Sequence, residues 1–445
     1  MKKTNLIIPL LFIAFLACQS EKKAEEKEIA VTSEEVHPAI VNQYVPTRAI
    51  TQGPKHHWFG YYDKLEVDPS GRFVLSNEVT FEGRSPTADD VIKVGMVDLE
   101  DNDKWIELGE SKAWGWQQGC MLQFLPNSET DIIWNDRVGD QFVSHIMNIK
   151  TREKRTLPFP IYALSPDGIH AVTTNFERIN DLRPGYGYAG IPDPNADEIA
   201  PDDAGIYLCN LQTGERKLII SLAQMMDVEL PEKDSPTFKN YKITKHWFNH
   251  LLFNTDGSRF IFLHRWKSSA DKNVGGFGTL MYTSDLSGKD LRLVDESGYT
   301  SHFIWKDREH IMAWSKIEPK GNGFYLFKDE EGATPEIEGE GIMTVNGHNT
   351  YLPQSTDWIL NDTYPDKNRV QKVYLYHVPT KKRIPIGDFY LDPKYRGEWR
   401  VDTHPRSSPD GTKVIIDCPT GDQGRQLYLL DISEILSTRA IIPEK

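Results

Sequence analysis

Four histidines stand at matching places in four successive repeats of the chain, each just upstream of a polar turn. They are His250, His302, His348 and His404. The turns that follow them are Asn254–Phe260, Lys306–Met312, Pro353–Ile359 and Ser408–Val414. Scattered histidines would not keep this phase. If the repeats surround a common axis, the phase predicts that four imidazoles meet in one pocket, where they could bind a metal ion or move protons.

A metal site is the first chemistry that this pattern predicts. Imidazole nitrogens together with a carboxylate suit a divalent ion, for which Zn, Mn and Ca are the candidates. The predicted ligands are His302, His348, Asp402 and His404. No HxH or HExxH motif accompanies them, so the repeat phase is the only signal. The alternative is a set of structural histidines, each hydrogen-bonded to a neighbouring repeat.

A second group of reactive side chains lies in the segment 54–64, PKHHWFGYYDK. His57 is a candidate for proton transfer, and Trp58 and Tyr61 are candidates for stacking on a sugar ring. The alternative is a strand whose aromatic side chains fill the core.

Two further groups contain arginine. Arg178, Arg183, Tyr186 and Tyr188 follow one another within a short segment. A guanidinium pairs with a carboxylate or sulfate, and a tyrosine near an arginine can have a lowered pKa and act as a base. Arg265, in the segment FLHRW, is a candidate for a second carboxylate clamp. The alternatives are a solvated loop for the first group and an ordinary strand-end pair for the second.

The elements that must position these residues recur along the chain. Seven segments share one plan of a strand-like run, a polar turn and a second run: 67–76, 125–134, 164–173, 253–262, 305–314, 352–361 and 407–416. Asp-Gly turns between apolar runs are hairpin signals, since glycine supplies the positive φ. Most openings are about 40–60 residues apart, which matches four short strands per unit. The sequence therefore predicts an all-β fold, a seven-bladed β-propeller.

Hairpins are expected to complete the repeats. They are predicted at 145–157, 206–219, 280–294, 373–386 and 427–436. The segment 180–205, rich in Pro, Gly and Asp, interrupts the spacing, and we interpret it as a long loop over one face, with a surface insertion as the alternative.

Composition limits the partners. The chain has 445 residues and a net charge of −14, with 39% hydrophobic residues, enough to bury a large core. The acidic balance argues against nucleic acid as a partner, and against an anionic membrane surface. Cys120, Cys209 and Cys418 show no CxxC spacing, so we expect buried, unpaired thiols. We expect a monomer.

The N-terminus is typical of a targeting segment. Lys2 and Lys3 precede an apolar run that ends at Ala17-Cys18, which resembles a bacterial lipobox with Cys18 as the lipidated residue. Residues 1–18 are therefore predicted as a lipoprotein signal peptide, 19–45 as a flexible acidic tether and 46–445 as the catalytic propeller. This organisation predicts an outer-membrane lipoprotein at the cell surface or periplasmic face, attached to the membrane only through its lipid anchor. A simple signal peptide is the alternative.

From about Thr51 to the C-terminus the chain resembles the β-propeller polysaccharide lyases. The segments 249–266, 301–305, 347–362 and 402–411 look like successive blade motifs of oligogalacturonate lyases, and HHWFGYYD looks closer to the ulvan-lyase branch. The first resemblance implies that His302 and His404 are metal ligands and that His250 is the proton acceptor. Asp402 stands where that family has another histidine. The second resemblance implies a tyrosine, a histidine and an arginine in the site, for which Tyr188, His57 and Arg183 are the candidates.

The expected reaction is β-elimination on a uronic-acid-containing, anionic glycan, of the sulfated ulvan type. It needs a base for the C5 proton, a cation to hold the carboxylate and an acid for the group leaving C4. A glycosidic leaving group makes the enzyme a lyase, whereas expulsion of water from a non-reducing-end uronate makes it a dehydratase. A non-catalytic glycan-binding propeller, and a periplasmic propeller of the TolB kind, are the alternatives from other classes.

Overall fold

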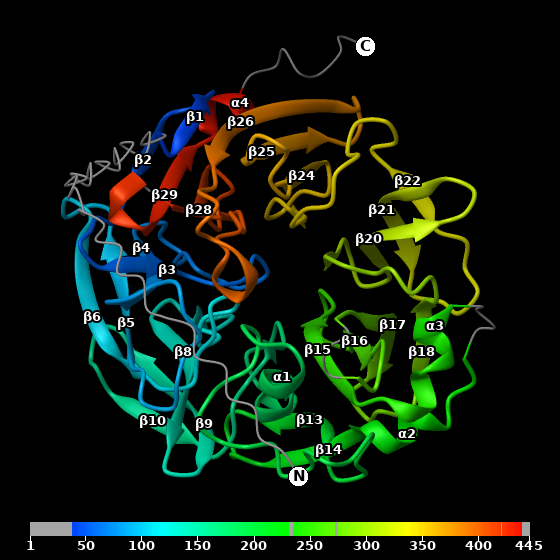
Figure 1. Cartoon of the computed structure of the whole chain (residues 1–445). Helices are drawn as coiled ribbons and strands as arrows, with labels where there is room; N and C mark the ends of the chain where they lie inside the picture. Colours follow the sequence, from blue (N-terminus) through cyan, green and yellow to red (C-terminus); the bar gives the residue numbers. More distant parts are fainter. Residues whose placement is uncertain (1–37, 231–234, 272–274, 420, 438–445) are drawn as a thin grey trace, which may run out of the picture. The chain divides into compact units, whose positions relative to one another are not determined.

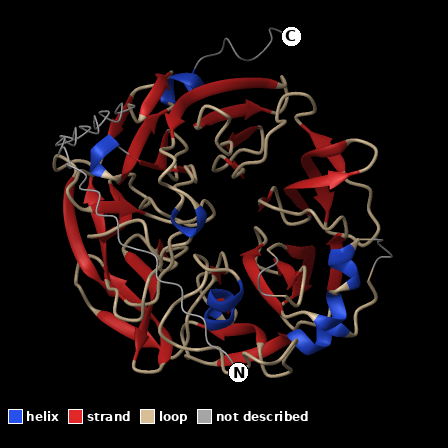
Figure 2. Ribbon diagram, viewed as in Figure 1, coloured by secondary structure: helices blue, strands red, loops and turns tan. Residues whose placement is uncertain are grey.

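Seven small antiparallel sheets make up almost all of the described structure. The computed structural model describes residues 38–230, 235–271, 275–419 and 421–437. Each sheet has four strands, except for one with five, and Figures 1 and 2 show the sheets arranged as blades around a central axis. The predicted all-β, seven-bladed β-propeller is confirmed.

The strands follow one order in every blade, from the innermost to the outermost. Blade one contains β3 (His56–Trp58), β4 (Phe73–Val79), β5 (Ile92–Asp98) and β6 (Lys104–Ser111). Blade two contains β7 (Gln123–Phe124), β8 (Asp131–Val138), β9 (Gln141–Asn148) and β10 (Lys154–Leu157). Blade three contains β11 (Ala163–Leu164), β12 (His170–Thr173), β13 (Gly205–Asn210) and β14 (Arg216–Ser221). Blade four contains β15 (His246–Phe253), β16 (Arg259–Lys267), β17 (Phe277–Asp285) and β18 (Leu291–Asp295). Blade five contains β19 (Phe303–Trp305), β20 (His310–Ile317), β21 (Gly321–Lys328) and β22 (Glu336–Glu338). Blade six contains β23 (Thr350–Tyr351), β24 (Trp358–Asn361), β25 (Val370–His377), β26 (Lys382–Tyr390) and β1 (Ile40–Gln43). Blade seven contains β27 (Arg406–Ser407), β28 (Lys413–Pro419), β29 (Arg425–Asp431) and β2 (Thr47–Ala49).

Short helices connect or flank these strands. They are α1 (Phe176–Leu182), α2 (Leu222–Met226), α3 (Pro236–Lys239) and α4 (Ser433–Ser437), with 3-10 turns η1 (Tyr241–Ile243), η2 (Gly397–Trp399) and η3 (Gly421–Gln423).

The two ends of the ring are joined by N-terminal strands. β2 pairs with β29 and supplies the outer strand of blade seven, while β1 pairs with β26 and adds a fifth strand to blade six. Residues 40–43, which we assigned to the tether, therefore belong to a sheet. The hairpin expected at 427–436 is not formed, because β29 is followed by α4 and β2 takes the neighbouring edge.

The predicted turns lie between the first and second strands of the blades. In the turn Ser165–His170, Gly168 has a φ of +70°, and the Asp167 carboxylate accepts a hydrogen bond from the N–H of Ile169 at 2.8 Å. The Asp-Gly pair thus forms the turn that its chemistry predicts.

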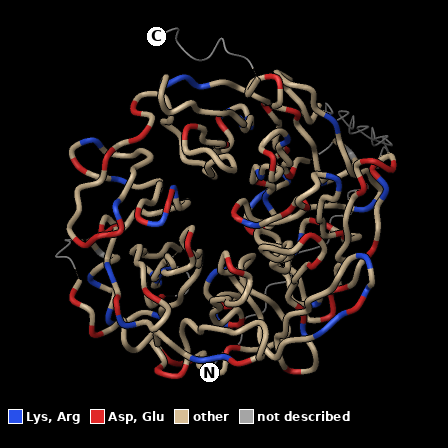
Figure 3. The backbone as a smooth tube through the Cα atoms, turned by 180° about the vertical axis from the view of Figure 1, so that it is seen from behind, with Lys and Arg blue, Asp and Glu red and all other residues tan. Residues whose placement is uncertain are grey.

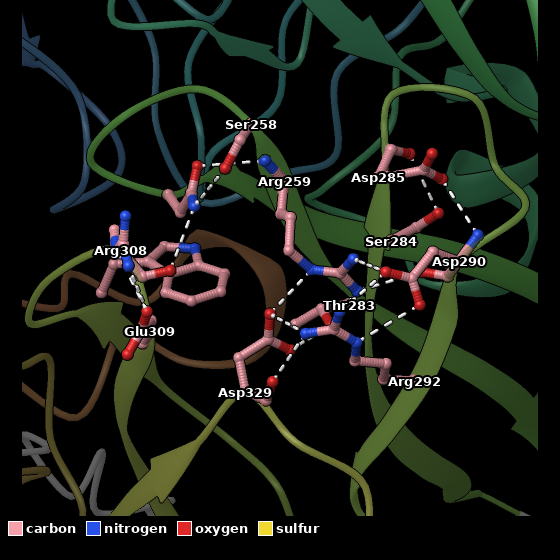
Figure 4. Close-up of polar contacts among 12 residues, drawn as sticks. Ser258, Arg259, Thr283, Ser284, Asp285, Asp290, Arg292, Arg308, Glu309 and Asp329 are labelled. Carbon is pink, nitrogen blue, oxygen red and sulfur yellow. Dashed lines mark hydrogen bonds and ion pairs between the residues drawn. The ribbon is translucent and has the colours of Figure 1, made fainter.

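An arginine network joins blades four and five at the turn end of β16 (Figure 4). Arg259 binds Asp290 of its own blade at 2.6 Å and Asp329 of blade five at 2.7 Å. Arg292 also donates to the Asp329 carbonyl at 2.7 Å. This network lies about 20 Å along β16 from Arg265, since a strand rises about 3.3 Å per residue.

The long segment after β12 begins with a helix and is fixed by Arg178. This side chain is buried, and its donors bind Asp193 and the carbonyls of His246, Asn195, Glu198 and Ile199 at 2.6–3.0 Å. Because these contacts occupy its donors, the structure corrects our prediction that Arg178 binds substrate: Arg178 orders the loop instead.

Other sequence predictions have mixed outcomes. Cys120, Cys209 and Cys418 are free and buried, as expected. Among the described residues, no helix has the length and apolar character needed to cross a membrane. Acidic and basic segments alternate around the outer rim (Figure 3). The signal peptide, Cys18 and most of the tether lie outside the described residues, so these stay predictions.

Candidate active site

A cavity of about 690 Å³ lies where the predicted residues of several blades come together. Its lining includes Tyr61, Arg183, Tyr186, His250, Arg265 and His302, which we predicted as site residues, together with Phe277, Thr279 and Tyr364. The volume is within the range of pockets for small ligands, about 300–1,000 Å³.

The four phased histidines meet beside this cavity. The ring centroids of His302 and His348 lie 4.0 Å apart, and those of His348 and His404 lie 4.2 Å apart. His250 stacks on Tyr61, with centroids 5.1 Å apart and an interplanar angle of 21°. The Tyr61 ring also lies 5.2 Å from that of His404. The convergence predicted from the repeat phase is therefore observed, with Tyr61 joining the fourth histidine to the row.

Two of these histidines have a strained backbone. The φ angles are +54° at His250 and +40° at His404, a region that residues other than glycine seldom adopt. In β15 the pairing register shifts between Asn249 and Leu252, so His250 lies in a bulge. Its N–H donates to the phenolic oxygen of Tyr162 at 2.7 Å. Strain of this kind gathers at functional sites, where it aims a side chain that a regular strand would turn away.

His348, Asp402 and His404 could hold a metal ion. Each offers one ligand atom, and these atoms lie within 4.8 Å of one another. Nε2 of His348, Nε2 of His404 and Oδ1 of Asp402 are buried, and no described residue forms a hydrogen bond with them. The Asp362 carboxylate contacts Nδ1 of His348 at 3.0 Å, which leaves Nε2 directed to the cluster. The donor set therefore fits a divalent ion that accepts nitrogen and oxygen ligands.

His302, the fourth predicted ligand, makes other contacts. Its Nδ1 lies 3.0 Å from the side-chain oxygen of Asn346, and its Nε2 lies 3.4 Å from the hydroxyl of Tyr364. Burial, followed by the neighbouring charge of His348, holds the pKa of His302 well below its ordinary value. The structure therefore keeps His302 in the histidine row but outside the group of three converging ligand atoms.

Two arginines give the cavity a positive wall. The guanidinium carbons of Arg183 and Arg265 lie 4.5 and 4.6 Å from the centroid of the Phe277 ring. Nε of Arg183, and Nε and Nη1 of Arg265, are buried and have no hydrogen-bond partner among the residues that the structure describes. Within the described part of the chain neither guanidinium has a carboxylate partner. Because buried cationic donors are normally paired, this arrangement indicates an anionic ligand.

The electrostatics of Arg265 support the same conclusion. Burial, followed by the charge of Arg183, lowers the pKa of Arg265 to about 9. A bound carboxylate would relieve both effects, since an opposite charge favours the protonated guanidinium. Thr279 lies opposite Arg265 in the β16–β17 register, and its hydroxyl is also buried without a partner.

His250 is neutral in this environment. Burial, followed by the charges of Arg265 and Arg183, holds its pKa well below the ordinary value. Its Nδ1 is buried and has no hydrogen-bond partner in the described part of the chain. A neutral imidazole with a free nitrogen beside two cations can accept a proton from a bound ligand, provided that the ligand is anionic.

The pKa of Tyr186 is shifted in the direction opposite to that of an ordinary buried phenol. Burial alone raises the pKa of a phenol, but the charges of Arg400 and Arg183 and a hydrogen bond from Arg400 lower the pKa of Tyr186 below its ordinary value. The Tyr186 ring lies edge-on to His250, with centroids 5.5 Å apart. The site therefore pairs a neutral imidazole with an acidic phenol.

Tyr188, which we predicted as catalytic, lies outside the cavity. Its ring is fully buried and stacks on Phe176, with centroids 4.1 Å apart. Its hydroxyl accepts a hydrogen bond from the side-chain amide of Asn135 at 2.9 Å. Burial raises the pKa of Tyr188 well above its ordinary value. The structure corrects this placement, since a core phenol of this kind is not a base.

His57 and Trp58 are also placed away from the cavity. Trp58 packs in the core against Trp114 and Trp116, with centroids 5.6 and 5.4 Å apart. His57 contacts Trp105 edge-on and lines a separate pocket. Burial, followed by the charge of Lys55, lowers the pKa of His57 to about 4. This strand is the core-filling alternative that the sequence left open, whereas Tyr61, four residues after His57, does reach the site.

Several residues that line or support the site were not predicted from the sequence. They are Tyr62, Phe277, Thr279, Asn346, Asp362, Tyr364 and Arg400. Arg400 had one usable signal: it stands two residues before Asp402, where an extended chain brings side chains to the same side. Its Nε donates to Asp402 at 2.8 Å. Tyr62 and Asp362 lie inside segments that resemble known motifs, but no pattern distinguishes these positions, and the other residues lie outside such segments.

No protein-family model matches this chain. No curated protein matches it either.

Solved structures match the fold over most of its length. An oligogalacturonate lyase from Vibrio parahaemolyticus has a TM-score of 0.59 and 14% identity, over 89% of this chain and 96% of that one. An oligogalacturonate lyase in complex with manganese has a TM-score of 0.59 and 13% identity, over 90% and 96%. The β-propeller domain of the Trilobed protease from Pyrococcus furiosus has a TM-score of 0.47 and 11% identity, over 84% and 96%. At these identities the first two support the propeller fold alone.

Proposed function

We propose that this protein is a carbon–oxygen lyase that acts by β-elimination on a uronic-acid residue of an anionic glycan. The observation that carries the proposal is the pair Arg183 and Arg265, whose buried donors lack partners and lie beside a neutral His250. The likeness to two oligogalacturonate lyases supports it at the level of fold. Ulvan-type substrates remain our preferred class because the HHWFGYYD segment resembles the ulvan-lyase branch.

The first step is the capture of the uronate carboxylate. A planar guanidinium binds a carboxylate through two parallel hydrogen bonds. Nε and Nη1 of Arg265 are buried donors that no described residue binds, and Nε of Arg183 is a third. Neutralising the carboxylate makes the neighbouring C5–H bond more acidic, because the guanidinium groups are already in place to stabilise the negative charge that develops when the proton leaves.

The second step transfers protons. Neutral His250 accepts the proton on C5, and the electron pair of that bond forms the C4=C5 double bond. The C4–O bond breaks with its electron pair on oxygen, and Tyr186 donates its proton to that oxygen. The products are a 4,5-unsaturated uronate and an alcohol. Proton return from His250 through solvent to Tyr186 restores the site, and no oxidant or reductant is needed.

The residues His348, Asp402 and His404 would hold a divalent metal ion next to this site. When bound, such an ion supplies Lewis-acid stabilisation of a carboxylate or hydroxyl oxygen of the substrate. Asp362 and Arg400 fix the ligand side chains through the contacts at 3.0 and 2.8 Å.

The same groups would serve a dehydratase if the reacting uronate is at a non-reducing end, since C4 then carries only a hydroxyl. A cavity of about 690 Å³ favours a short oligosaccharide over a long chain. The test is incubation with ulvan, its oligomers and oligogalacturonides, followed by ultraviolet absorbance of the unsaturated uronate and mass spectrometry. Shortened products with unsaturated ends indicate a lyase, and loss of one water without shortening indicates a dehydratase.

Arg265→Gln is the variant that probes the proposal, with Arg292→Gln, in the network of Figure 4, as a control on the same blade. We expect the first to lose kcat/KM by about 100-fold or more and the second to retain it. Glycan binding without any turnover by the parent protein would contradict the enzyme proposal and favour a binding propeller.

A further inference from the structure

One aromatic side chain at the rim of the cavity is left open to solvent. Tyr299 is 59% exposed, the highest fraction of any large hydrophobic side chain in the described part of the chain, and it lines the cavity. An isolated exposed tyrosine needs no explanation, but one at the rim of a polar cavity has a flat face available to a ligand.

The loop that presents Tyr299 is held in place from below. Asp295, at the end of β18, is almost fully buried, and its carboxylate accepts hydrogen bonds from the N–H of Ser297 at 2.9 Å and from the hydroxyls of Ser315 and Thr300. The N–H of Tyr299 in turn donates to the hydroxyl of Ser297 at 3.1 Å. The exposed ring therefore stands on a rigid support, which lowers the entropic cost of using it to bind.

A lysine lies beside the ring. Nζ of Lys316, on β20, is 5.3 Å from the centroid of Tyr299. Lys316 forms an ion pair at 3.3 Å with Glu318, whose side chain is 73% exposed, and such surface pairs contribute little to stability. The ammonium is therefore available to an acidic group that lies over or beside the ring.

The ring and the lysine continue the wall of the cavity outward from the histidine row. Trp314 lies two residues before Lys316 on β20, so the two side chains point to the same face, and Trp314 lines the cavity. The N–H of Trp314 donates to the carbonyl of His302 at 2.9 Å. The strand β20 thus connects the backbone of His302, which lines the cavity, with Lys316 beside the exposed ring.

We infer that Tyr299 and Lys316 form a binding subsite for a second sugar ring of the glycan, one that carries a carboxylate or sulfate. The apolar C–H face of the sugar packs on the phenol ring, and its acidic substituent pairs with the ammonium. This inference rests on the proposed function, since it takes the glycan to be held at the same time by Arg183 and Arg265. It makes the enzyme selective for oligosaccharides over single uronates.

The test measures binding apart from turnover, in a His250→Ala background of the full chain. The probes are methyl glucuronoside, which has one ring, and tetrasaccharides prepared from ulvan and from polygalacturonate. In the Tyr299→Ala variant we expect the Kd of the better-bound tetrasaccharide to rise about tenfold, the value of one stacking contact of about 1.4 kcal/mol. The Kd of the single-ring probe should change by less than about twofold, because that ligand reaches only the arginines.

Three further variants accompany this measurement. Tyr299→Phe keeps the ring and should bind as the parent does. Lys316→Gln should weaken the acidic tetrasaccharide and reduce the salt dependence of its binding. Val138→Ala removes another exposed side chain, on β8, and should change nothing.

The outcomes separate the two ideas. The subsite is overturned if the Tyr299→Ala variant and the background protein bind the tetrasaccharides with the same Kd. It is also overturned if Tyr299→Ala raises the Kd of the single-ring probe by the same factor as the Kd of the tetrasaccharide. Failure of both tetrasaccharides to bind the background protein overturns it as well. Tyr299-dependent binding with no turnover by the parent protein supports the subsite and overturns the enzyme proposal.

Discussion

The guanidinium of Arg400 donates a hydrogen bond from Nη2 to the phenolic oxygen of Tyr186 at 2.9 Å, across 214 residues of sequence. Its Nε binds Asp402 at 2.8 Å. One arginine therefore connects the phenol that we assign as the acid with a carboxylate of the candidate metal set. Burial raises the pKa of both phenols, but at Tyr186 the charges of Arg400 and Arg183 outweigh burial, so Tyr186, and not Tyr188, has the lowered pKa.

Replacing each of these two tyrosines by phenylalanine should separate chemistry from packing. Tyr186→Phe removes the proton donor, so we expect kcat to fall by about 100-fold or more, with a small change in KM. Tyr188→Phe removes only the hydrogen bond from Asn135. That variant should retain kcat and lose about 1 kcal/mol of unfolding free energy. Steady-state kinetics and urea denaturation check both, and equal kinetic losses in the two variants would contradict the assignment.

The pH profile of kcat/KM should have two limbs. Burial and the charges of Arg265 and Arg183 hold the pKa of His250 well below its ordinary value. Protonation of this base should therefore reduce the rate only at a pH well below the ordinary pKa of histidine. On the alkaline side, Tyr186 loses its proton below the ordinary phenol value, and Arg265 loses its proton as the pH rises through about 9, so both losses reduce the rate. We expect a plateau at neutral pH, measured at constant ionic strength. A single acid limb at the ordinary histidine value would argue against a buried, neutral His250.

Metal content should depend on the three converging ligands. We expect the parent protein, incubated with Mn²⁺ or Zn²⁺ and then desalted, to retain an ion that His404→Ala does not retain. Asp362→Asn should weaken binding by about 10–100-fold, because it loosens His348 without removing a ligand. His145→Ala is a suitable control, since His145 also contacts a carboxylate, Asp136 at 3.1 Å, but does not belong to the cluster. Elemental analysis checks all four proteins, and equal metal contents would exclude this site.

The repeat pattern of the sequence predicted the fold and part of the site. In each blade the first strand is followed by a turn whose chemistry is local, as in Ser165–His170, so the repeats can be found without tertiary information. His250, His302 and His404 lie four residues before those turns, and His348 lies five residues before its turn. A ring brings such nearly equivalent positions of successive blades together as neighbouring side chains. The convergence therefore followed from the period alone.

The irregular segments could not be interpreted in this way. Tyr186 and Tyr188 lie in a loop without a period, so nothing in the sequence distinguishes the tyrosine that faces the cavity from the one that stacks on Phe176. Arg178 has the same residue type as Arg183 but points into the loop, where Asp193 and backbone carbonyls bind it. Which donors remain unpaired depends on the folded loop, not on the residue type.

The joint between blades one and seven should be sensitive to the loss of a buried arginine. Arg406 donates from Nε to Glu66 at 2.6 Å and from Nη2 to Asp417 at 3.2 Å, and all three side chains are buried. It also donates to the carbonyl of His404. Arg406→Met leaves two carboxylates without a cation, so we expect a loss of about 3–5 kcal/mol in unfolding free energy. Denaturant titration measures it, and a loss below about 1 kcal/mol would mean that the pair contributes little.

Glu66 should also make stability depend on pH in an unusual direction. Two buried carboxyl groups share one guanidinium, so burial outweighs the attraction to Arg406 and raises the pKa of Glu66 to about 7. The pKa of Asp417 is raised too, for the same first reason. In the unfolded chain Glu66 titrates near 4.5. Between these two values the folded state holds the proton more tightly, so the stabilisation is complete below the unfolded pKa and is lost as the pH rises to about 7. Glu66→Gln cannot titrate, so its unfolding free energy relative to the parent should increase steadily from pH 4.5 to pH 7 and then level off. Parallel stability curves for the two proteins would show that Glu66 is ionised throughout, held by Arg406.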